Sequence, residues 1–207
     1  MTPSIVFDIE TSGLPEADQL ETFQPVFEPD ARLKDAAKIE ASITEKREAW
    51  LETAALHAER SRVLCIGMTS EGQVSILEGD EKPMLEQVWR NFDSSNALWI
   101  GHNIKGFDVP YLARRSYIQG VKVPLGLMDG RYLSRRFIDT MEVWGAGERG
   151  ARISLDNLSR ALGVGKKSGS GKDFAALYRS NREEALAYLR QDLALAAACA
   201  KKMEVMV

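Results

Sequence analysis

Apolar positions along the chain follow two periods, one typical of strands and one typical of helices. Short runs of apolar, β-branched and aromatic residues predict five strands, at residues 5–9, 63–68, 73–77, 97–100 and 137–140. Stretches with apolar residues at helical spacing predict helices, at residues 83–92, 107–119, 154–163 and 182–203. The order of three strands, a helix, a strand and a helix predicts an α/β fold with a mixed central sheet flanked by helices.

One segment, residues 15–60, interrupts this order after the first strand. Residues 15–30 are acidic and aromatic and contain three prolines, which predicts an irregular excursion. Residues 31–60 are rich in Ala, Glu, Lys and Arg and contain no Gly or Pro, which predicts one long helix or a helical hairpin. We therefore expect a single domain, residues 1–207, with a helical insertion at about residues 15–60, which either covers the sheet or shapes access for a substrate or partner.

Composition narrows the class of protein. The hydrophobic fraction of 44% and the charged fraction of 28% are typical of a soluble globular domain. A net charge of −3 means that any nucleic-acid binding has to use local basic patches. The two cysteines, Cys65 and Cys199, have no metal-ligand spacing, which argues against a disulfide framework and a Cys₄ zinc site. The first strand begins almost at once and no apolar run approaches a membrane span, so we expect a cytoplasmic protein with no membrane partner.

Two carboxylates end the first strand. Asp8 and Glu10 are separated by one residue, and residues i and i+2 of a strand point to the same side. Like charges held side by side repel each other, and partial burial increases the cost. A cation between them is the usual remedy, and oxygen ligands suit hard divalent ions such as Mg²⁺ or Mn²⁺. For this pair alone, a strand end with solvated acids is the simpler alternative.

Two further groups of residues occur later in the chain. Asn103, Phe107 and Asp108 lie where the fourth predicted strand passes into a helix. Tyr188 and Asp192 are four residues apart on the last predicted helix and therefore share a face. Taken singly, these residues also suit a helix cap, a loop contact, a core position or a solvated surface. Their order along the chain is more informative than any one of them.

Together, the three motifs resemble those of the DEDD superfamily of 3′–5′ exonucleases, in its tyrosine-containing subgroup. The phrases F-D-I-E-T and G-H-N-I-K-G-F-D are most similar to those of the proofreading exonuclease domain of family B DNA polymerases and its stand-alone relatives. The resemblance covers the three motifs and the order of the elements, but not residues 15–60. It implies a ribonuclease H-like fold.

The resemblance also implies a role for each matching residue. The matching acids would bind two divalent metal ions, Mg²⁺ or Mn²⁺, and are Asp8, Glu10, Asp108 and Asp192. Two such ions activate a water molecule and neutralise charge on the departing 3′ oxygen. Tyr188 matches the residue that orients the attacking water, whereas His102 does not match a general base. Asn103 and Phe107 match positions near the terminal nucleotide, and burial in the core is the alternative for Phe107.

Local positive charge is expected to hold the phosphates of the substrate. The candidate side chains are Lys105, Arg115, Lys166, Lys167 and Lys172. Each of them also suits a solvated surface position. Three of the five lie in residues 165–172, a Gly/Ser-rich and basic segment that predicts a mobile loop.

The leading hypothesis is a two-metal-ion 3′–5′ exonuclease acting on the 3′ end of single-stranded nucleic acid, with DNA favoured over RNA. It would release nucleoside 5′-monophosphates. A single domain has no room for a polymerase, so proofreading would require a polymerase partner in trans. One alternative is a ribonuclease that trims short RNA. Another is a non-catalytic module that binds nucleic acid or associates with a polymerase.

Overall fold

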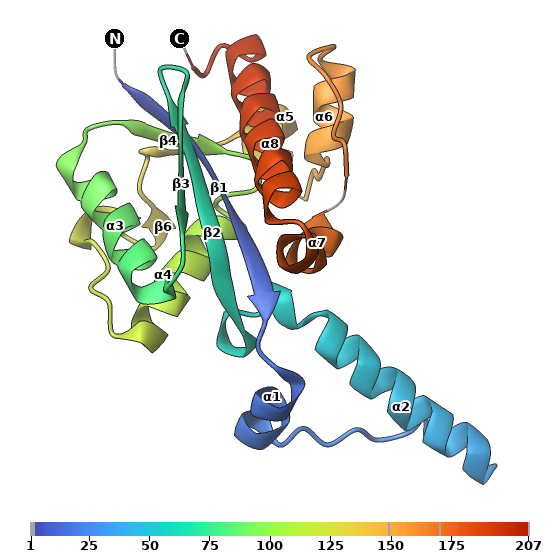
Figure 1. Cartoon of the computed structure of the whole chain (residues 1–207). Coiled ribbons are helices and arrows are strands. Elements are labelled where there is room, and N and C mark those ends of the chain that lie inside the picture. The colour runs from blue at the N-terminus through green and yellow to red at the C-terminus, as the bar shows by residue number, and fades with distance from the viewer. Residues whose placement is uncertain (1–2, 149, 170, 207) are drawn as a thin grey trace. The chain divides into compact units, whose positions relative to one another are not determined.

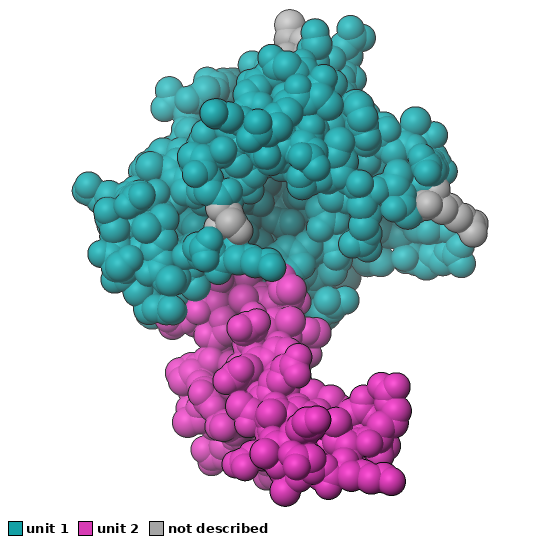
Figure 2. Space-filling model, turned by 90° about the vertical axis from the view of Figure 1, so that its right-hand side faces the viewer, with its two compact units in different colours: residues 1–10, 63–207 teal, residues 11–62 magenta. Residues whose placement is uncertain are grey.

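The computed structural model describes residues 3–148, 150–169 and 171–206, and the chain divides into two compact units (Figure 2). Unit 1 comprises residues 1–10 and 63–207, and unit 2 comprises residues 11–62. Unit 2 corresponds closely to the predicted insertion. The organisation of the chain as a single functional domain stays a prediction.

A mixed five-stranded sheet forms the centre of unit 1. In spatial order, its strands are β3 (Gln73–Glu78), β2 (Ser61–Ser70), β1 (Ser4–Gly13), β4 (Leu98–Gly101) and β7 (Phe137–Asp139). β1, β4 and β7 pair in parallel, whereas β2 and β3 form an antiparallel hairpin. The predicted α/β fold is therefore confirmed, and it is consistent with a ribonuclease H-like exonuclease fold.

Helices cover both faces of this sheet. They are α3 (Glu81–Ser94), α4 (Asp108–Gln119), α5 (Thr140–Gly145), α6 (Leu155–Ala161), α7 (Phe174–Ser180) and α8 (Arg182–Lys202). Figure 1 shows α3 and α4 on one face of the sheet and α8 with α6 and α7 on the other. The short helices α5 and α7 were not predicted from the sequence.

Alternating side chains of the strands build a core on each face. Phe7 of β1 and Trp99 of β4 pack edge to face, with ring centroids 5.2 Å apart, and Phe92 of α3 lies 5.8 Å from Trp99. Val6 and Ile100, their neighbours along the strands, join the cluster formed by α8. Burying side chains of this size stabilises the fold by about 1.5–3 kcal/mol each.

A small hairpin follows α4 within residues 120–136. A 3₁₀ turn at Leu125–Leu127 precedes it. The hairpin strands are β5 (Met128–Asp129) and β6 (Tyr132–Leu133), paired antiparallel. Gly130 occupies the turn with a φ of 63°, a backbone conformation that glycine adopts readily.

Unit 2 contains two helices, α1 (Glu16–Phe23) and α2 (Ala36–Glu52). The prediction that residues 15–30 are irregular is therefore wrong over α1. Pro15 is the N-cap of this helix, with a φ of −50°, and its carbonyl accepts the first helical hydrogen bond from the Gln19 N–H at 3.1 Å. The predicted long helix is present as α2, and its first turn is capped by the side chain of Asp35, which accepts a hydrogen bond from the Lys38 N–H at 3.1 Å.

After α2, two 3₁₀ turns at Ala54–Leu56 and Ala58–Arg60 lead into β2. The Arg60 guanidinium lies 4.2 Å from the centroid of the Trp50 ring and donates a 2.6 Å hydrogen bond to the Trp50 carbonyl. This contact fixes the end of unit 2 against its own helix. None of the helices in the described part of the chain is long and apolar enough to cross a membrane.

Candidate active site

β1 directs two carboxylates to the face of the sheet that α8 covers. Because strand residues alternate, Asp8 and Glu10 point to the same side as Val6, which shares a core cluster with Leu189 of α8. Asp8 is half-buried, and Glu10 is buried. The two acids thus lie together, as their spacing predicts.

α8 brings the next two side chains to this point. It packs closely against β2 because Gly67 has no side chain, and a Cβ there would lie 2.8 Å from Leu193 Cδ1. Tyr188 and Asp192, one helical turn apart, are both buried on the same helix. Asp8, Glu10 and Asp192 each offer a carboxylate oxygen, and these oxygens lie within 4.8 Å of one another.

Asp108, the first residue of α4, lines the same pocket of about 290 Å³ but is not part of this three-acid cluster. It is buried, and its Oδ1 accepts a hydrogen bond from the Ile9 N–H at 3.1 Å. The start of α4 is thereby tied to β1 between its two acids. The backbone of β1 and the side chain of Asp108 therefore position each other.

The concentration of buried acids disfavours their ionised forms. Burial, followed by the charge of Asp192, raises the pKa of Asp8 to about 7. Burial, followed by the charges of Asp8 and Asp192, raises the pKa of Glu10 to about 10. Burial also raises the pKa of Asp108 and of Asp192. A cluster of this kind is stabilised by a cation, which favours the ionised carboxylates over the protonated ones.

One cation of the chain already lies in the pocket. Lys167 Nζ is 2.5 Å from Asp192 Oδ2 and 5.0 Å from the centroid of the Tyr188 ring. Burial alone would lower the pKa of Lys167, but the combined effect of Asp192 and Tyr188 outweighs burial, and the pKa is raised. Hydrogen bonds hold the backbone around it, from the Lys167 N–H to Asp156 Oδ1 at 2.8 Å and from Gln191 Nε2 to the Lys166 carbonyl at 3.1 Å. The residue predicted to bind phosphate therefore contacts the acids themselves.

Two polar atoms at the pocket, the Tyr188 hydroxyl and Asp192 Oδ1, form no hydrogen bond of good geometry among the described residues, although Lys167 is close enough to the hydroxyl to influence its pKa. Burial raises the pKa of Tyr188, so its phenol is neutral and able to donate a hydrogen bond. The glycine-rich segment lies against its ring, since a Cβ at Gly169 would be 3.4 Å from Tyr188 Cδ2 and Cε2. Buried polar atoms without a partner are unusual in proteins, and here they suit a ligand or water in the pocket.

Asn103 and Phe107 line the pocket, as predicted for residues near a substrate. Asn103 has a φ of 61°, and this backbone turn is held by a buried carboxylate that sequence reasoning missed. Asp139, at the end of β7, accepts hydrogen bonds from the N–H groups of Asn103 at 2.8 Å, Lys105 at 3.0 Å and Met141 at 2.9 Å. Its place at the end of a strand was the only sign in the sequence.

The other predicted cations do not line this pocket. Arg115 is buried, and its guanidinium forms a bidentate pair with Glu81 of α3, at 2.6 and 2.8 Å. Since its charge already serves to join α4 to α3, we correct the expectation that Arg115 contacts substrate. Lys105 pairs with Glu142 at 2.7 Å in a neighbouring hollow, and Lys166 and Lys172 are exposed.

His102 also lines the pocket, but both of its ring nitrogens are engaged. Nε2 lies 2.8 Å from the Ile153 carbonyl oxygen, and Nδ1 lies 3.0 Å from Thr140 Oγ1. Because a carbonyl only accepts, Nε2 carries the proton. Burial lowers the pKa of His102, so the ring is neutral and ties the end of β4 to the segment before α6.

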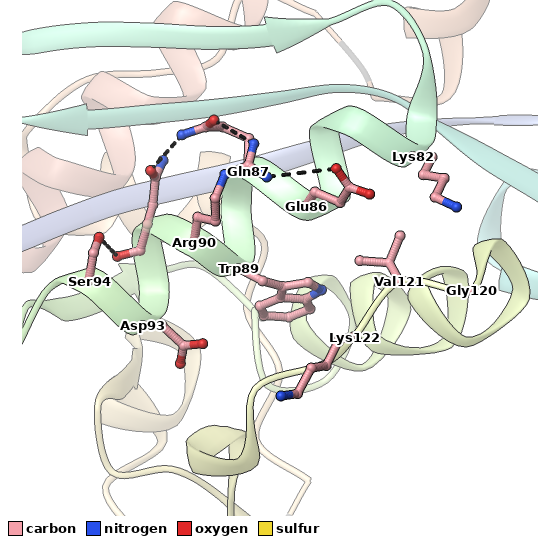
Figure 3. Close-up of a pocket in the computed structure, with 11 residues that line it drawn as sticks. Lys82, Glu86, Gln87, Trp89, Arg90, Asp93, Ser94, Gly120, Val121 and Lys122 are labelled. Atoms are coloured by element: carbon pink, nitrogen blue, oxygen red, sulfur yellow. Dashed lines mark hydrogen bonds and ion pairs between the residues drawn. The ribbon is translucent and has the colours of Figure 1, made fainter.

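A larger hollow of about 830 Å³ lies between α3 and the residues that follow α4 (Figure 3). It contains none of the predicted site residues. Lys82 and Lys122 lie at its edges, and Arg90 pairs with Glu86 at 3.7 Å. The indole of Trp89 points inward and donates a 2.8 Å hydrogen bond to Ser116. With no acid cluster and no exposed aromatic ring, this groove offers no chemistry comparable to that of the acidic pocket.

A family model described as "Predicted 3'-5' exonuclease related to the exonuclease domain of PolB" matches residues 54–195, more than half of the 207-residue chain. The chain belongs to this exonuclease family. Membership supports a nuclease that acts on nucleic acid, and it confirms the resemblance to the PolB exonuclease domain. A search of curated proteins found no match to the chain.

The exonuclease-family match and the structure identify different residues of the acidic pocket. The match includes Asp108, Tyr188 and Asp192, but it begins after Asp8 and Glu10. The structure brings the two acids of β1 into the same pocket as the matched residues. The pocket thus joins two parts of the chain that were identified independently.

Proposed function

We propose that this chain is a metal-dependent 3′–5′ exonuclease of the tyrosine-containing DEDD subgroup, which removes nucleoside 5′-monophosphates from the 3′ end of single-stranded nucleic acid. The observation that carries the proposal is the three-acid cluster of Asp8, Glu10 and Asp192, with oxygens within 4.8 Å of one another and the Tyr188 hydroxyl in the same pocket. Family membership supports the direction of cleavage.

The pocket suits divalent metal ions in its ligand chemistry. Its acids supply hard oxygen ligands, Asp192 Oδ1 has no hydrogen-bond partner, and an ammonium lies where a cation stabilises the cluster. Asp8, Glu10 and Asp192 would hold one ion, and Asp108 would contribute to a second, with Mg²⁺ or Mn²⁺ as the candidates. Such ions supply a more acidic water and neutralise charge on the departing 3′ oxygen.

The remaining residues of the pocket bind the substrate and orient the attacking water. The neutral phenol of Tyr188 donates a hydrogen bond to the attacking water, because a group with a raised pKa is a poor base at neutral pH. Asn103 and Phe107 hold the terminal nucleotide at the rim. Lys167, which pairs with Asp192 in this structure, would contact the scissile phosphate when the acids hold metal ions. Lys166 and Lys172 contact phosphates further along the strand.

The test is degradation of a 5′-labelled single-stranded DNA with Mg²⁺ or Mn²⁺ and with chelator. We expect products that shorten from the 3′ end, and no cleavage in the presence of chelator. The cleavage rate should fall to roughly one thousandth in Asp8→Asn and in Asp192→Asn. Asp93→Asn, an acid at the groove of Figure 3, is the matched control and should cleave normally. Shortening from the 5′ end, or equal activity in all variants, would contradict the proposal.

A parallel RNA of the same sequence tests the choice of sugar. The preference for DNA rests on the relation to the PolB exonuclease domain. Faster trimming of RNA would instead favour the ribonuclease alternative. A polymerase that acts in trans would be the partner for proofreading, and the expected sign is faster removal of a mismatched 3′ end when that polymerase is added.

A non-catalytic module that binds nucleic acid is the second candidate, and the position of Lys167 favours it. In such a module the ammonium would serve as the permanent cation of the cluster. Thermal unfolding with and without Mg²⁺ separates the two. A metal site stabilises the fold by about 2.7 kcal/mol at a metal concentration one hundred times its Kd. A lysine that fills the site permanently leaves the melting temperature unchanged.

A further inference from the structure

We propose that a second hollow, lined by Lys105, Arg131, Tyr132 and Arg135, binds the nucleotides that precede the terminal one in a single-stranded nucleic acid. The hollow has a volume of about 630 Å³ and lies beside the β5–β6 hairpin. This inference rests on the proposed function, because it extends the path of the same strand.

The two hollows share a rim. Asn103 and Met141 line the acidic pocket, and Lys105 and Glu142, close to them in the chain, line the second hollow. Asp139 holds both sides of this rim through the N–H groups of Asn103, Lys105 and Met141. A strand whose 3′ end lies in the acidic pocket therefore meets the second hollow next.

Three cations give this hollow its affinity for phosphate. Lys105 Nζ pairs with Glu142 at 2.7 Å, and Arg135 Nε lies 3.7 Å from Asp129. These pairs are on the surface, and the Arg135 side chain is 96% exposed. Exposed ion pairs are weak, so a phosphate competes with them for the same cations.

Tyr132 gives the hollow a surface for a base. Tyr132 is 63% exposed, so its ring is accessible to a base. The Arg131 guanidinium lies 4.8 Å from the ring centroid and donates a 2.5 Å hydrogen bond to the hydroxyl, so the ring is held in place. Bases stack on such rings without regard to sequence, as an exonuclease that removes any nucleotide requires.

The groove of Figure 3 shows why a group of charged side chains alone does not indicate a nucleic-acid-binding site. It also contains three cations and two acids, Lys82, Arg90, Lys122, Glu86 and Asp93. Its aromatic residue, Trp89, is 5% exposed and has no face available to a base. Unlike the second hollow, which contains Glu142 next to Met141, it has no lining residue adjacent in the chain to one of the acidic pocket. It therefore provides a matched control for the second hollow.

Binding is measured by fluorescence anisotropy of a labelled single-stranded DNA in chelator, which prevents cleavage. We expect Tyr132→Ala to weaken binding roughly tenfold and Tyr132→Phe to restore it. The double variant Arg131→Ala/Arg135→Ala should lower the slope of log K against log salt by about 0.7 for each phosphate contact removed. Lys82→Ala/Lys122→Ala should bind as the unaltered protein does. Equal binding by all variants, or no binding by any protein, overturns the proposal.

Cleavage separates this proposal from the proposed function. On an oligonucleotide, Tyr132→Ala should raise KM with little change in kcat, because the substituted residue does not touch the reacting atoms. On the p-nitrophenyl ester of thymidine 5′-monophosphate, which has no preceding nucleotide, the variant should match the unaltered protein. A protein that binds as expected but cleaves neither substrate refutes the proposed function alone. Normal cleavage with unchanged KM in the variants refutes the second hollow alone.

Discussion

At the scale of single residues, the polar side chains buried in the acidic pocket lower the free energy of unfolding. Four acids lie there with raised pKa values, and the buried Tyr188 hydroxyl and Asp192 Oδ1 form no hydrogen bond of good geometry within the part of the chain that the structure describes. Each such group disfavours the folded state unless something binds to it. Strained or unsatisfied groups of this kind are typical of functional sites.

Tyr188→Phe isolates the hydroxyl from the ring. Since the hydroxyl forms no hydrogen bond of good geometry with the described residues, its removal should leave the free energy of unfolding unchanged or slightly raised. Exonuclease activity should fall by roughly a hundredfold if the hydroxyl orients the water. Urea unfolding and initial cleavage rates measure the two effects.

Tyr178→Phe is the control for this substitution. It removes a hydroxyl that donates to Glu78 at 2.8 Å, outside the acidic pocket, so it should cost about 1 kcal/mol of stability and leave activity unchanged. Full activity in Tyr188→Phe would show that the hydroxyl has no role in the reaction.

Residue types and spacing predicted most of the pocket but not its cations. Strand and helix periods predicted that Asp8 lies beside Glu10 and Tyr188 beside Asp192, and the resemblance to exonuclease motifs linked these two pairs with Asp108. Arg115 was misjudged because its partner, Glu81, lies on another helix and no local pattern reveals the pair. The contact of Lys167 with Asp192 was missed for the same reason.

At the scale of elements, the site depends on how closely α8 approaches β2. Gly67 permits this approach, and Leu189 and Leu193 fill the space beside it. The same helix carries Tyr188 and Asp192, so its distance from the sheet sets the distance between Asp192 and the acids of β1.

Gly67→Ala should therefore weaken both stability and metal binding. The added Cβ would lie 2.8 Å from Leu193 Cδ1 and 3.0 Å from Leu189 Cγ, which forces α8 outward at a cost of about 1–3 kcal/mol. Urea unfolding measures the first effect, and calorimetric titration with Mn²⁺ measures the second. Gly126→Ala, where a Cβ meets nothing within 4 Å, is the matched control. Unchanged Mn²⁺ affinity in a destabilised Gly67→Ala would argue against this coupling.

Helices and strands were predictable from the sequence where the segment was long enough to show a periodic apolar pattern. The sheet strands, α3, α4, α6 and α8 follow the apolar patterns, whereas α5, α7 and β5–β6 are too short to show one. Two misses did have local signals. Pro15 precedes α1, and the dipeptide Asp129-Gly130 is typical of a hairpin turn.

At the scale of the whole molecule, the acidic pocket makes stability depend on pH and on metal. The folded, metal-free protein keeps protons on Asp8 and Glu10 up to pKa values of about 7 and about 10. In the unfolded chain these groups ionise near about pH 4. Above that pH the unfolded chain binds fewer protons than the folded protein, so the free energy of unfolding falls as pH rises. Lys167 adds no slope near neutrality, because its raised pKa keeps it protonated in both states.

We expect the metal-free protein to lose stability steadily between about pH 5 and about pH 8, and Mg²⁺ to stabilise it more at the higher pH, where ionised carboxylates are needed. Asp8→Asn should flatten the pH dependence and remove most of the stabilisation by Mg²⁺. Urea unfolding at several pH values, with chelator or Mg²⁺, provides the measurement. Stability that rises with pH in chelator would contradict the raised pKa values.

The pocket draws its acids from β1 at one end of the printed sequence and from α8 at the other. During synthesis the ribosome therefore produces Asp8 and Glu10 long before Tyr188 and Asp192. A nascent chain that has folded its first strands still lacks half of the pocket, and contacts so distant in sequence form late. The acidic pocket, and with it the proposed cleavage, therefore cannot form before α8 has packed against the sheet.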